Sequence, residues 1–182
     1  NDQSIFGKVI QINKNNGGYI LISKGHRNQQ GMQILDTGKM LLTEHGPKGG
    51  DEINLVDLER NVVKNFGWPL ASYGVHYDSV PLNNAIQKIA PLKKSHKANG
   101  FEEPIKYFTP SIGISQIIKN FYSNENSFFV TSLKKQKIYN IVFDSEFKNP
   151  KILEEIEIGE RIRDIIYDKE EKKYYLYLEG SP

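Results

Sequence analysis

The chain has 182 residues, of which 38% are hydrophobic and 25% charged, a balance typical of a globular protein with one core. Its net charge of +2 is too small and too evenly spread to indicate nucleic-acid binding. No apolar run approaches the roughly 20 residues of a membrane-spanning helix, and the lack of cysteine excludes disulfides and thiolate metal sites.

Short apolar runs bounded by turn residues recur along the chain, and few segments have helical periodicity. This pattern predicts an all-β sandwich, barrel or propeller. The turn DTGK joins two runs as a hairpin, with Gly38 free to adopt a positive φ. In chain order, the predicted strands are 5–12, 18–23, 32–35, 39–44, 52–58, 114–122, 127–133, 137–144, 151–158, 162–168 and 173–179.

The exception to this pattern is the segment 70–111, which is long, punctuated by proline and poorly periodic. We expect it to be a loop excursion over one face of the β scaffold, with IQKI forming a single helical turn. It contains the basic cluster LKKSHK (92–97), for which a solvated loop is the favoured interpretation.

Arginine is scarce, with four residues against twenty lysines, and three of the four lie in the motifs GHRNQQG (25–31) and GERIRD (159–164). Arg161 and Arg163 are two apart in a predicted strand, so their side chains share a face. Two guanidinium groups on one face suit a planar polycarboxylate or a phosphate. Pairing with acids is the commoner role of such arginines, and the nearby candidates are Glu157, Glu160 and Asp164.

The stretch LLTEHGPKGGDEIN (41–54) begins as a strand and breaks into turn chemistry. Gly46 permits close backbone approach, and Pro47 stiffens the turn while its carbonyl stays free to accept. Exposed carbonyls in a stiff turn suit Ca²⁺, although a plain turn is the commoner explanation. His45 alone indicates a structural hydrogen bond more often than a base or a ligand. Lys134 and Lys135, at the end of a predicted strand, look like ordinary edge lysines.

The order of the motifs is more specific than any one of them. GHRNQQG, TEHGPKGGDEIN, NFGWP, SYG, FTPSIG, SLKK and RIRD follow one another as in the soluble PQQ-dependent aldose sugar dehydrogenases, also called glucose/sorbosone dehydrogenases. The chain resembles this family over about residues 6 to 180. The resemblance implies a six-bladed β-propeller of four-stranded antiparallel blades. We expect 1–182 to be one partial propeller domain of about three blades.

The same resemblance implies an enzyme that oxidises the C1 hydroxyl of aldoses to lactones, in the periplasm or outside the cell. Arg27 would act in catalysis by stabilising negative charge on the reduced quinone. The backbone carbonyls of Gly46 and Pro47 would bind the Ca²⁺ that also holds PQQ. The side chains implied to contact PQQ are Arg27, Asn28, His45, Lys134, Arg161 and Arg163.

Other residues are implied to support this site. Gln30 would hold the GHRN turn, and Asp51 and Glu52 would brace the loop before them. An aromatic residue near FTPSIG would cover the sugar, with Tyr107 or Phe108 as the candidate. The chain departs from the family pattern here, and also at Gln29, where the family usually has proline.

The family's general base is a histidine located before the GHRN motif, and none of the four histidines of this chain matches it. We therefore expect this chain to be the second half of the enzyme, poorly stable and inactive without the missing N-terminal half. The electron acceptor and the sugar are not indicated. The alternative is a non-enzymatic propeller that binds a protein or glycan partner, and the retained cations Arg27, Lys134, Arg161 and Arg163 favour the enzyme.

Overall fold

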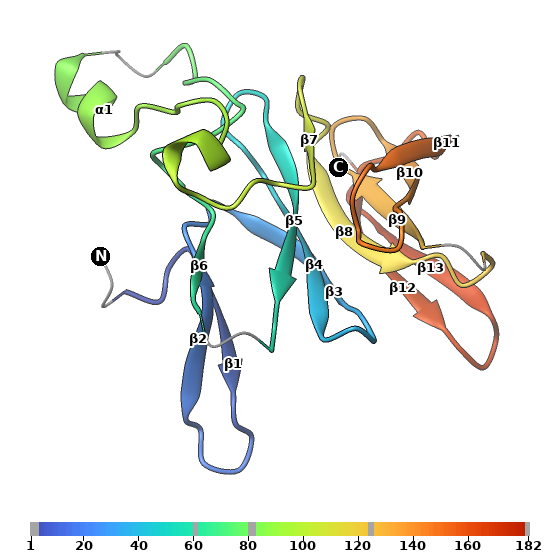
Figure 1. Cartoon of the computed structure of the whole chain (residues 1–182). Helices are drawn as coiled ribbons and strands as arrows, with labels where there is room; N and C mark the ends of the chain where they lie inside the picture. Colours follow the sequence, from blue (N-terminus) through green and yellow to red (C-terminus); the bar gives the residue numbers. More distant parts are fainter. Residues whose placement is uncertain (1–3, 60–61, 80–82, 124–125, 181–182) are drawn as a thin grey trace.

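The computed structural model in Figure 1 describes residues 4–59, 62–79, 83–123 and 126–180. Every strand predicted from the apolar runs is present, and two short strands, β6 and β7, are added. The strands are β1 Lys8–Ile12, β2 Tyr19–Lys24, β3 Gln29–Ile34, β4 Lys39–Glu44, β5 Asp51–Asp57, β6 Lys64–Asn65, β7 Lys106–Phe108, β8 Ile114–Lys119, β9 Ser127–Ser132, β10 Lys137–Val142, β11 Lys151–Glu157, β12 Ile162–Asp168 and β13 Lys173–Leu178.

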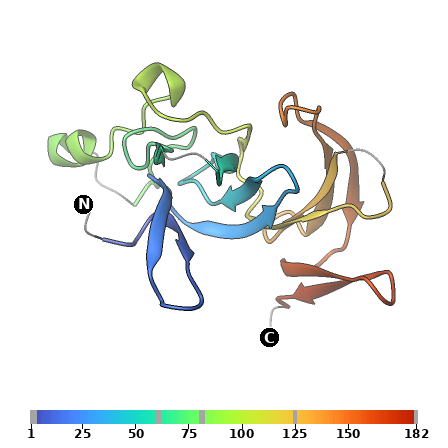
Figure 2. The same ribbon diagram turned by 60° about the horizontal axis from the view of Figure 1, so that its bottom comes forward.

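The strands form four sheets, with orders β1-β2-β6, β3-β4-β5-β7, β8-β9-β10-β11 and β12-β13. Two of them are four-stranded antiparallel sheets of the kind expected for propeller blades. The other two sheets are smaller, with three strands in the first and two in the last. In the first sheet, β6 pairs with β2 in parallel over two residues. Figure 2 shows the sheets following one another across the molecule, from the blue hairpin to the red one.

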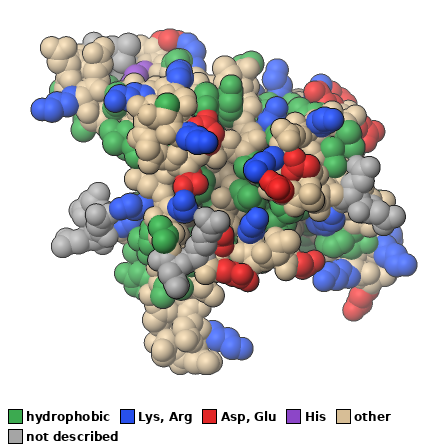
Figure 3. All heavy atoms as spheres, viewed as in Figure 1, with side chains coloured by type: hydrophobic (Ala, Val, Ile, Leu, Met, Phe, Trp, Pro, Cys, Tyr) green, Lys and Arg blue, Asp and Glu red, His purple; other side chains and the backbone are tan. Residues whose placement is uncertain are grey.

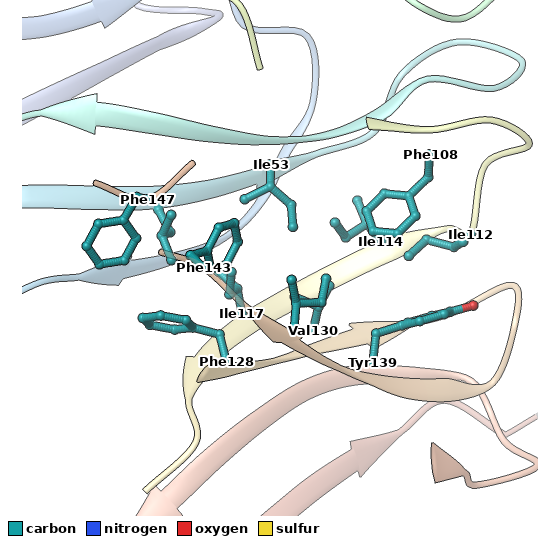
Figure 4. Close-up of a cluster of buried hydrophobic side chains, with 12 residues drawn as sticks. Ile53, Phe108, Ile112, Ile114, Ile117, Phe128, Val130, Tyr139, Phe143 and Phe147 are labelled. Carbon is teal, nitrogen blue, oxygen red and sulfur yellow. The ribbon is translucent and has the colours of Figure 1, made fainter. Parts of the chain in front are cut away.

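The hydrophobic core lies between successive sheets because alternate residues of a strand face opposite sides. On β4, Leu41 packs toward β8 and β9, whereas Met40 and Leu42 pack toward the first sheet with Ile22. The larger cluster fills the space between the two four-stranded sheets, where side chains from both sheets converge (Figure 4). Because successive sheets pack on each other in this way, the loops at the ends of adjacent sheets have fixed relative positions.

The hairpin predicted at DTGK is confirmed, with Gly38 at φ 69°. However, β3 begins at Gln29, earlier than the apolar run at 32–35 predicts. Gln29 pairs with Glu44 of β4, so the GHRNQQG motif enters the sheet directly. Gly31 lets β8 approach closely, because its ideal Cβ would lie 2.7 Å from the Cα of Gln116 and 2.9 Å from the Ser115 carbonyl oxygen.

The segment 70–111 is more ordered than a loop excursion. It contains α1 Asn84–Ile89, which includes the predicted turn IQKI, and a 3₁₀ helix, η1 Lys97–Asn99. Its last part is β7, which pairs with β5 and completes a four-stranded sheet. Three of its residues, 80–82, lie outside the described part of the chain.

The basic cluster LKKSHK is a loop whose three lysines are exposed, as the favoured interpretation expects, but two of its other residues are buried. Leu92 and His96 are buried, with 7% and 2% of their surface exposed. The Lys94 ammonium group donates to the backbone carbonyls of Ser72 and Tyr73 at 3.2 and 2.8 Å. Lys94 thus holds two parts of the segment 70–111 together, and His96, 3.3 Å from Glu52 on β5, connects the segment to that sheet.

On the face shown in Figure 3, lysine and arginine side chains are interspersed with acidic ones. Within the described residues, no helix is long and apolar enough to cross a membrane.

Candidate functional site

Hydrogen bonds connect most of the residues that are predicted to contact the cofactor. The Arg27 Nη1 atom donates to the His45 carbonyl at 3.1 Å, and the Asn28 amide nitrogen is 3.5 Å from His45 Nδ1. Gln30 donates to the Asn28 side chain at 3.0 Å and accepts from Arg163 Nη1 at 3.4 Å. Residues 133 positions apart in sequence therefore meet, one on β3 and the other on β12.

His45 is fixed in one tautomer. Its Nε2 atom is 2.6 Å from the carbonyl oxygen of Ile114, and a carbonyl only accepts, so Nε2 carries the hydrogen. In the neutral ring, Nδ1 is then the acceptor for the Asn28 amide. Both ring nitrogens are used by the protein, so His45 positions the group of Arg27 and Asn28 rather than offering a free base.

Asp51 holds the turn after β4 in place. Its Oδ1 atom accepts from the Gly46 N–H at 3.3 Å, and its Oδ2 atom accepts from Gly113 and Ile114 at 2.7 and 3.1 Å. The residue is 1% exposed. A buried carboxylate that accepts three backbone N–H bonds fixes both segments, as the bracing role expected for Asp51 requires.

The turn itself presents two backbone oxygens. The carbonyls of Gly46 and Pro47 accept no hydrogen bond from the residues that the structure describes. Hard oxygen atoms in a rigid turn suit Ca²⁺, which takes six to eight such ligands. No group of three His, Asp or Glu side chains within the described ranges could hold a metal ion. A Ca²⁺ here would therefore need further oxygens from a bound molecule and water.

Arg161 and Arg163 together hold a carboxylate. Arg161 donates to Glu179 Oε2 through Nε at 3.2 Å and Nη2 at 3.0 Å, and Arg163 Nη2 lies 3.0 Å from both oxygens. Hydrogen bonds from Arg163 and Arg161 lower the pKa of Glu179. The two side chains come together as predicted, but their partner is neither Glu157, Glu160 nor Asp164.

Lys134 is an exposed side chain at the turn after β9. Its backbone N–H donates to the Ile112 carbonyl at 3.1 Å, and its backbone lies against Gly113, which Asp51 also binds. Lys134 is thus connected to the turn of Gly46 through Gly113 and Asp51.

Tyr107 and Phe108 alternate on β7 and face opposite sides. Phe108 is 7% exposed and packs in the core, so it is not available to cover a sugar. Tyr107 is 45% exposed and stacks on Tyr73, with ring centroids 3.7 Å apart. Of the two candidates, only Tyr107 keeps an accessible ring.

A buried polar network beneath Arg27 was not predicted from the sequence. Glu44 accepts from the Arg27 backbone N–H at 2.7 Å, from Asn54 at 2.6 Å and from His26 Nδ1, 3.2 Å away. His26 Nε2 lies 2.8 Å from the Ser23 hydroxyl. The network fixes the backbone of the GHRN turn. The one feature of the sequence that points to this buried network is the acidic residue at the end of the apolar strand KMLLTE.

A second buried acid, Glu52, lies 3.3 Å from His96 Nε2. Burial raises the pKa of Glu52, with the charge of Glu44 acting in the same direction. Burial alone would lower the pKa of His96, but the interaction with Glu52 outweighs it, and the net pKa of His96 is raised. Tyr73 stacks on His96 with ring centroids 5.4 Å apart, and its hydroxyl donates to Glu103.

We expect this pair to make the chain less stable as the pH rises. A folded-state pKa of Glu52 above 4.5 gives stability that is lost as the pH increases through that raised value. A folded-state pKa of His96 above 6.5 likewise gives stability that is present below 6.5 and lost above the raised value. The thermal midpoint should therefore fall between about pH 5 and pH 8.

The matched variants for this measurement are Glu52→Gln and the exposed Glu146→Gln. Glu52→Gln should flatten the fall of the midpoint, because glutamine cannot release a proton in the buried position. Glu146→Gln should keep the wild-type profile, since Glu146 pairs only with Lys148 on the surface. A midpoint that rises with pH in the wild type would contradict the assignment.

Known proteins match this chain over most of its length. The model of the family described as Glucose / Sorbosone dehydrogenase matches residues 2–181. Aldose sugar dehydrogenase YliI of Escherichia coli (strain K12) is 32% identical over 168 residues, which cover 87% of this chain and 41% of that protein. Quinoprotein glucose dehydrogenase B of Acinetobacter calcoaceticus is 38% identical over 76 residues, 35% of this chain and 15% of that protein.

Solved structures of sugar dehydrogenases have a similar fold. The crystal structure of the soluble aldose sugar dehydrogenase from Escherichia coli, in the apo-form, superposes with a TM-score of 0.73 at 26% identity. The match covers 94% of this chain and 51% of that chain, so this chain spans about half of the structure it resembles. Its sheets correspond to part of a β-propeller. The chain belongs to the glucose / sorbosone dehydrogenase family.

Proposed function

We propose that this chain supplies most of the cofactor-binding half of an enzyme that oxidises the C1 hydroxyl of aldoses to lactones with PQQ and Ca²⁺. The observation that carries the proposal is the pair Arg161 and Arg163, which jointly hold the carboxylate of Glu179. PQQ is a planar tricarboxylate, and paired guanidinium forks match that chemistry. The names of the relatives, an aldose sugar dehydrogenase and a quinoprotein, support the same substrate and cofactor classes.

The residues of the site fit both groups. When bound, the quinone would accept hydride from the sugar, and Ca²⁺ would polarise the quinone oxygens. Arg161, Arg163 and Lys134 would hold carboxylates at the rim. Arg27 is positioned by the His45 carbonyl and by the Trp68 ring, 5.2 Å from its guanidinium carbon, and would stabilise negative charge that develops nearby. The Gly46 and Pro47 carbonyls would contribute two Ca²⁺ ligands.

The base that takes the proton of the sugar hydroxyl is not assigned to this chain. Each of its four histidines uses at least one ring nitrogen in a contact with the protein. The contacts are His26 with Ser23 and Glu44, His45 with Ile114, His76 with the Ala90 carbonyl at 2.9 Å, and His96 with the Phe66 carbonyl at 2.8 Å. We propose that the base comes from a part of the enzyme outside this chain, and that the enzyme acts in the periplasm or outside the cell.

Titration of the full chain with PQQ, with and without Ca²⁺, tests the cofactor assignment through the absorbance of the quinone. Saturable binding that Ca²⁺ strengthens is expected. Sugar-dependent reduction of a dye is then the test of the reaction, and we expect none from this chain alone. No binding of PQQ would favour the alternative function, a non-enzymatic propeller in which Arg161 and Arg163 have only a structural role.

In this proposal, Glu179 competes with the carboxylates of PQQ for Arg161 and Arg163, so Glu179→Gln should strengthen PQQ binding. The variant keeps the size of the side chain but removes the charge that pairs with Arg161 and Arg163. The gain should be modest, about 2-fold to 5-fold, because ion pairs of exposed side chains contribute little. Glu171→Gln is the control, since Glu171 pairs with Lys173 on the surface. Weaker binding by Glu179→Gln would contradict the assignment of the arginine pair.

A further inference from the structure

A small cavity lies between Arg27 and the buried acids. Its volume is about 10 Å³, and its lining includes Arg27, Glu44, Glu52, Trp68 and His96. Two side-chain atoms of these residues, Arg27 Nε and His96 Nε2, are buried and form no hydrogen bond with the described residues. Buried polar groups are nearly always hydrogen-bonded, so two such atoms on the wall of one cavity require an explanation.

The two atoms have complementary roles. Arg27 Nε always carries a hydrogen and is a donor. His96 Nδ1 lies 2.8 Å from the Phe66 carbonyl oxygen, which only accepts, so Nδ1 carries the hydrogen of the neutral ring. His96 Nε2 is then an acceptor. Glu52 Oε1 is 3.3 Å from Nε2, and at a pH above the raised pKa values of both groups, where His96 is neutral and Glu52 ionised, neither atom carries a hydrogen for the other.

We propose that one water molecule binds in this cavity and bridges Arg27 to the Glu52–His96 pair. The water would accept from Arg27 Nε–H and donate its two hydrogens to His96 Nε2 and to a carboxylate oxygen of Glu52. Three hydrogen bonds are the usual number for a buried water, and a cavity of about 10 Å³ is the size of one.

Other occupants fit the cavity less well. A cation would face the permanent charge of Arg27, and an anion would face Glu44 and Glu52. An apolar group would leave both orphan atoms without a partner. Water is the one small ligand that both accepts from Arg27 and donates to His96.

The bridge makes His96 a positioning residue for Arg27. The imidazole is held by the Phe66 carbonyl and by the stacked ring of Tyr73, and through the water it would fix the Nε side of the guanidinium. The His45 carbonyl fixes the Nη1 side. This inference does not depend on the proposed cofactor, because the water should be present whether or not a quinone binds.

Nuclear magnetic resonance of the full chain at mildly alkaline pH tests the bridge directly. The chain has four arginines, so its Nε–H signals are few, and Arg27→Lys identifies the one from Arg27. We expect slow exchange of this hydrogen and a cross-peak to a long-lived bound water. Both should disappear in His96→Phe, in which the ring fills the cavity and offers no acceptor.

His76→Phe is the matched control, because His76 binds the Ala90 carbonyl and is not among the residues that line this cavity. It should keep the cross-peak. The proposal is overturned if the wild type has no water contact at Arg27 Nε–H, or if the contact survives in His96→Phe. Electron density in crystals of the wild-type chain gives a second measurement that does not depend on the variant folding. Density for one water within hydrogen-bond distance of Arg27 Nε and His96 Nε2 supports the bridge, and its absence in well-ordered density overturns it.

Discussion

Replacing Asp51 with alanine is expected to lower the free energy of unfolding by about 3 kcal/mol. The carboxylate is buried and accepts from the N–H groups of Gly46, Gly113 and Ile114. Alanine would leave these donors without a partner, and each buried unsatisfied donor costs about 1–3 kcal/mol, with entry of water reducing the total. Chemical denaturation followed by circular dichroism measures the loss.

Two further variants separate the carboxylate from the loss of a side chain in general. Asp51→Asn keeps one acceptor oxygen and should lose about half as much stability, roughly 1–2 kcal/mol. Asp78→Ala removes an aspartate whose side chain is 87% exposed and pairs only with Lys48, and it should change stability by less than about 0.5 kcal/mol. Equal stability of Asp51→Ala and Asp78→Ala would show that Asp51 does not brace the turn.

The same substitution should weaken Ca²⁺ binding in the proposed enzyme. Asp51 accepts from the Gly46 N–H and so holds the turn whose carbonyls are the proposed Ca²⁺ ligands. Calorimetric titration with Ca²⁺ in the presence of PQQ would measure this effect. A stability loss without any change in Ca²⁺ affinity would argue that the metal binds elsewhere.

The strands could be predicted from the sequence because the alternation that identifies a strand involves only residues close together along the chain. The hairpin at Gly38 needs only a turn residue between two apolar runs, and it forms where expected. β7 was missed because KYF is too short to establish alternation and follows a proline-rich segment. Its place in the sheet depends on pairing with β5, which is remote in sequence.

The buried contacts of the site could not be predicted for the same reason. Glu44 binds the Arg27 backbone across 17 residues, and Asp51 reaches Ile114 across 63. The sequence spacing of such partners follows no rule. The order of the motifs identifies the residues of the site but not the contacts between them.

The arginine pair is an example of a contact that the sequence does not predict. Arg161 precedes β12, and the register shifts between Ile162 and Asp164, so strand alternation alone does not bring the two side chains together. Their common partner Glu179 follows from the pairing of β12 with β13.

Replacing Arg27 with leucine is expected to weaken PQQ binding by about 100-fold, which corresponds to roughly 2.7 kcal/mol. The guanidinium lies over the Trp68 ring. In the proposed enzyme it would bind the cofactor, and leucine would leave the negative charge of the quinone without its partner. Arg27→Lys keeps the charge but loses the planar fork that binds the His45 carbonyl, so a smaller loss of about 10-fold is expected.

The Arg27 variants should separate binding from folding. The hydrogen bond from residue 27 to Glu44 is made by the backbone and survives both substitutions. Leucine also removes the buried Nε donor, so the unfolding free energy should change little while PQQ affinity falls. Lys148→Ala, which removes a surface cation paired with Glu146, controls for net charge and should leave affinity unchanged. If Arg27→Leu binds PQQ as tightly as the wild type, the arginine does not contact the cofactor, and its interactions with Trp68 and His45 are purely structural.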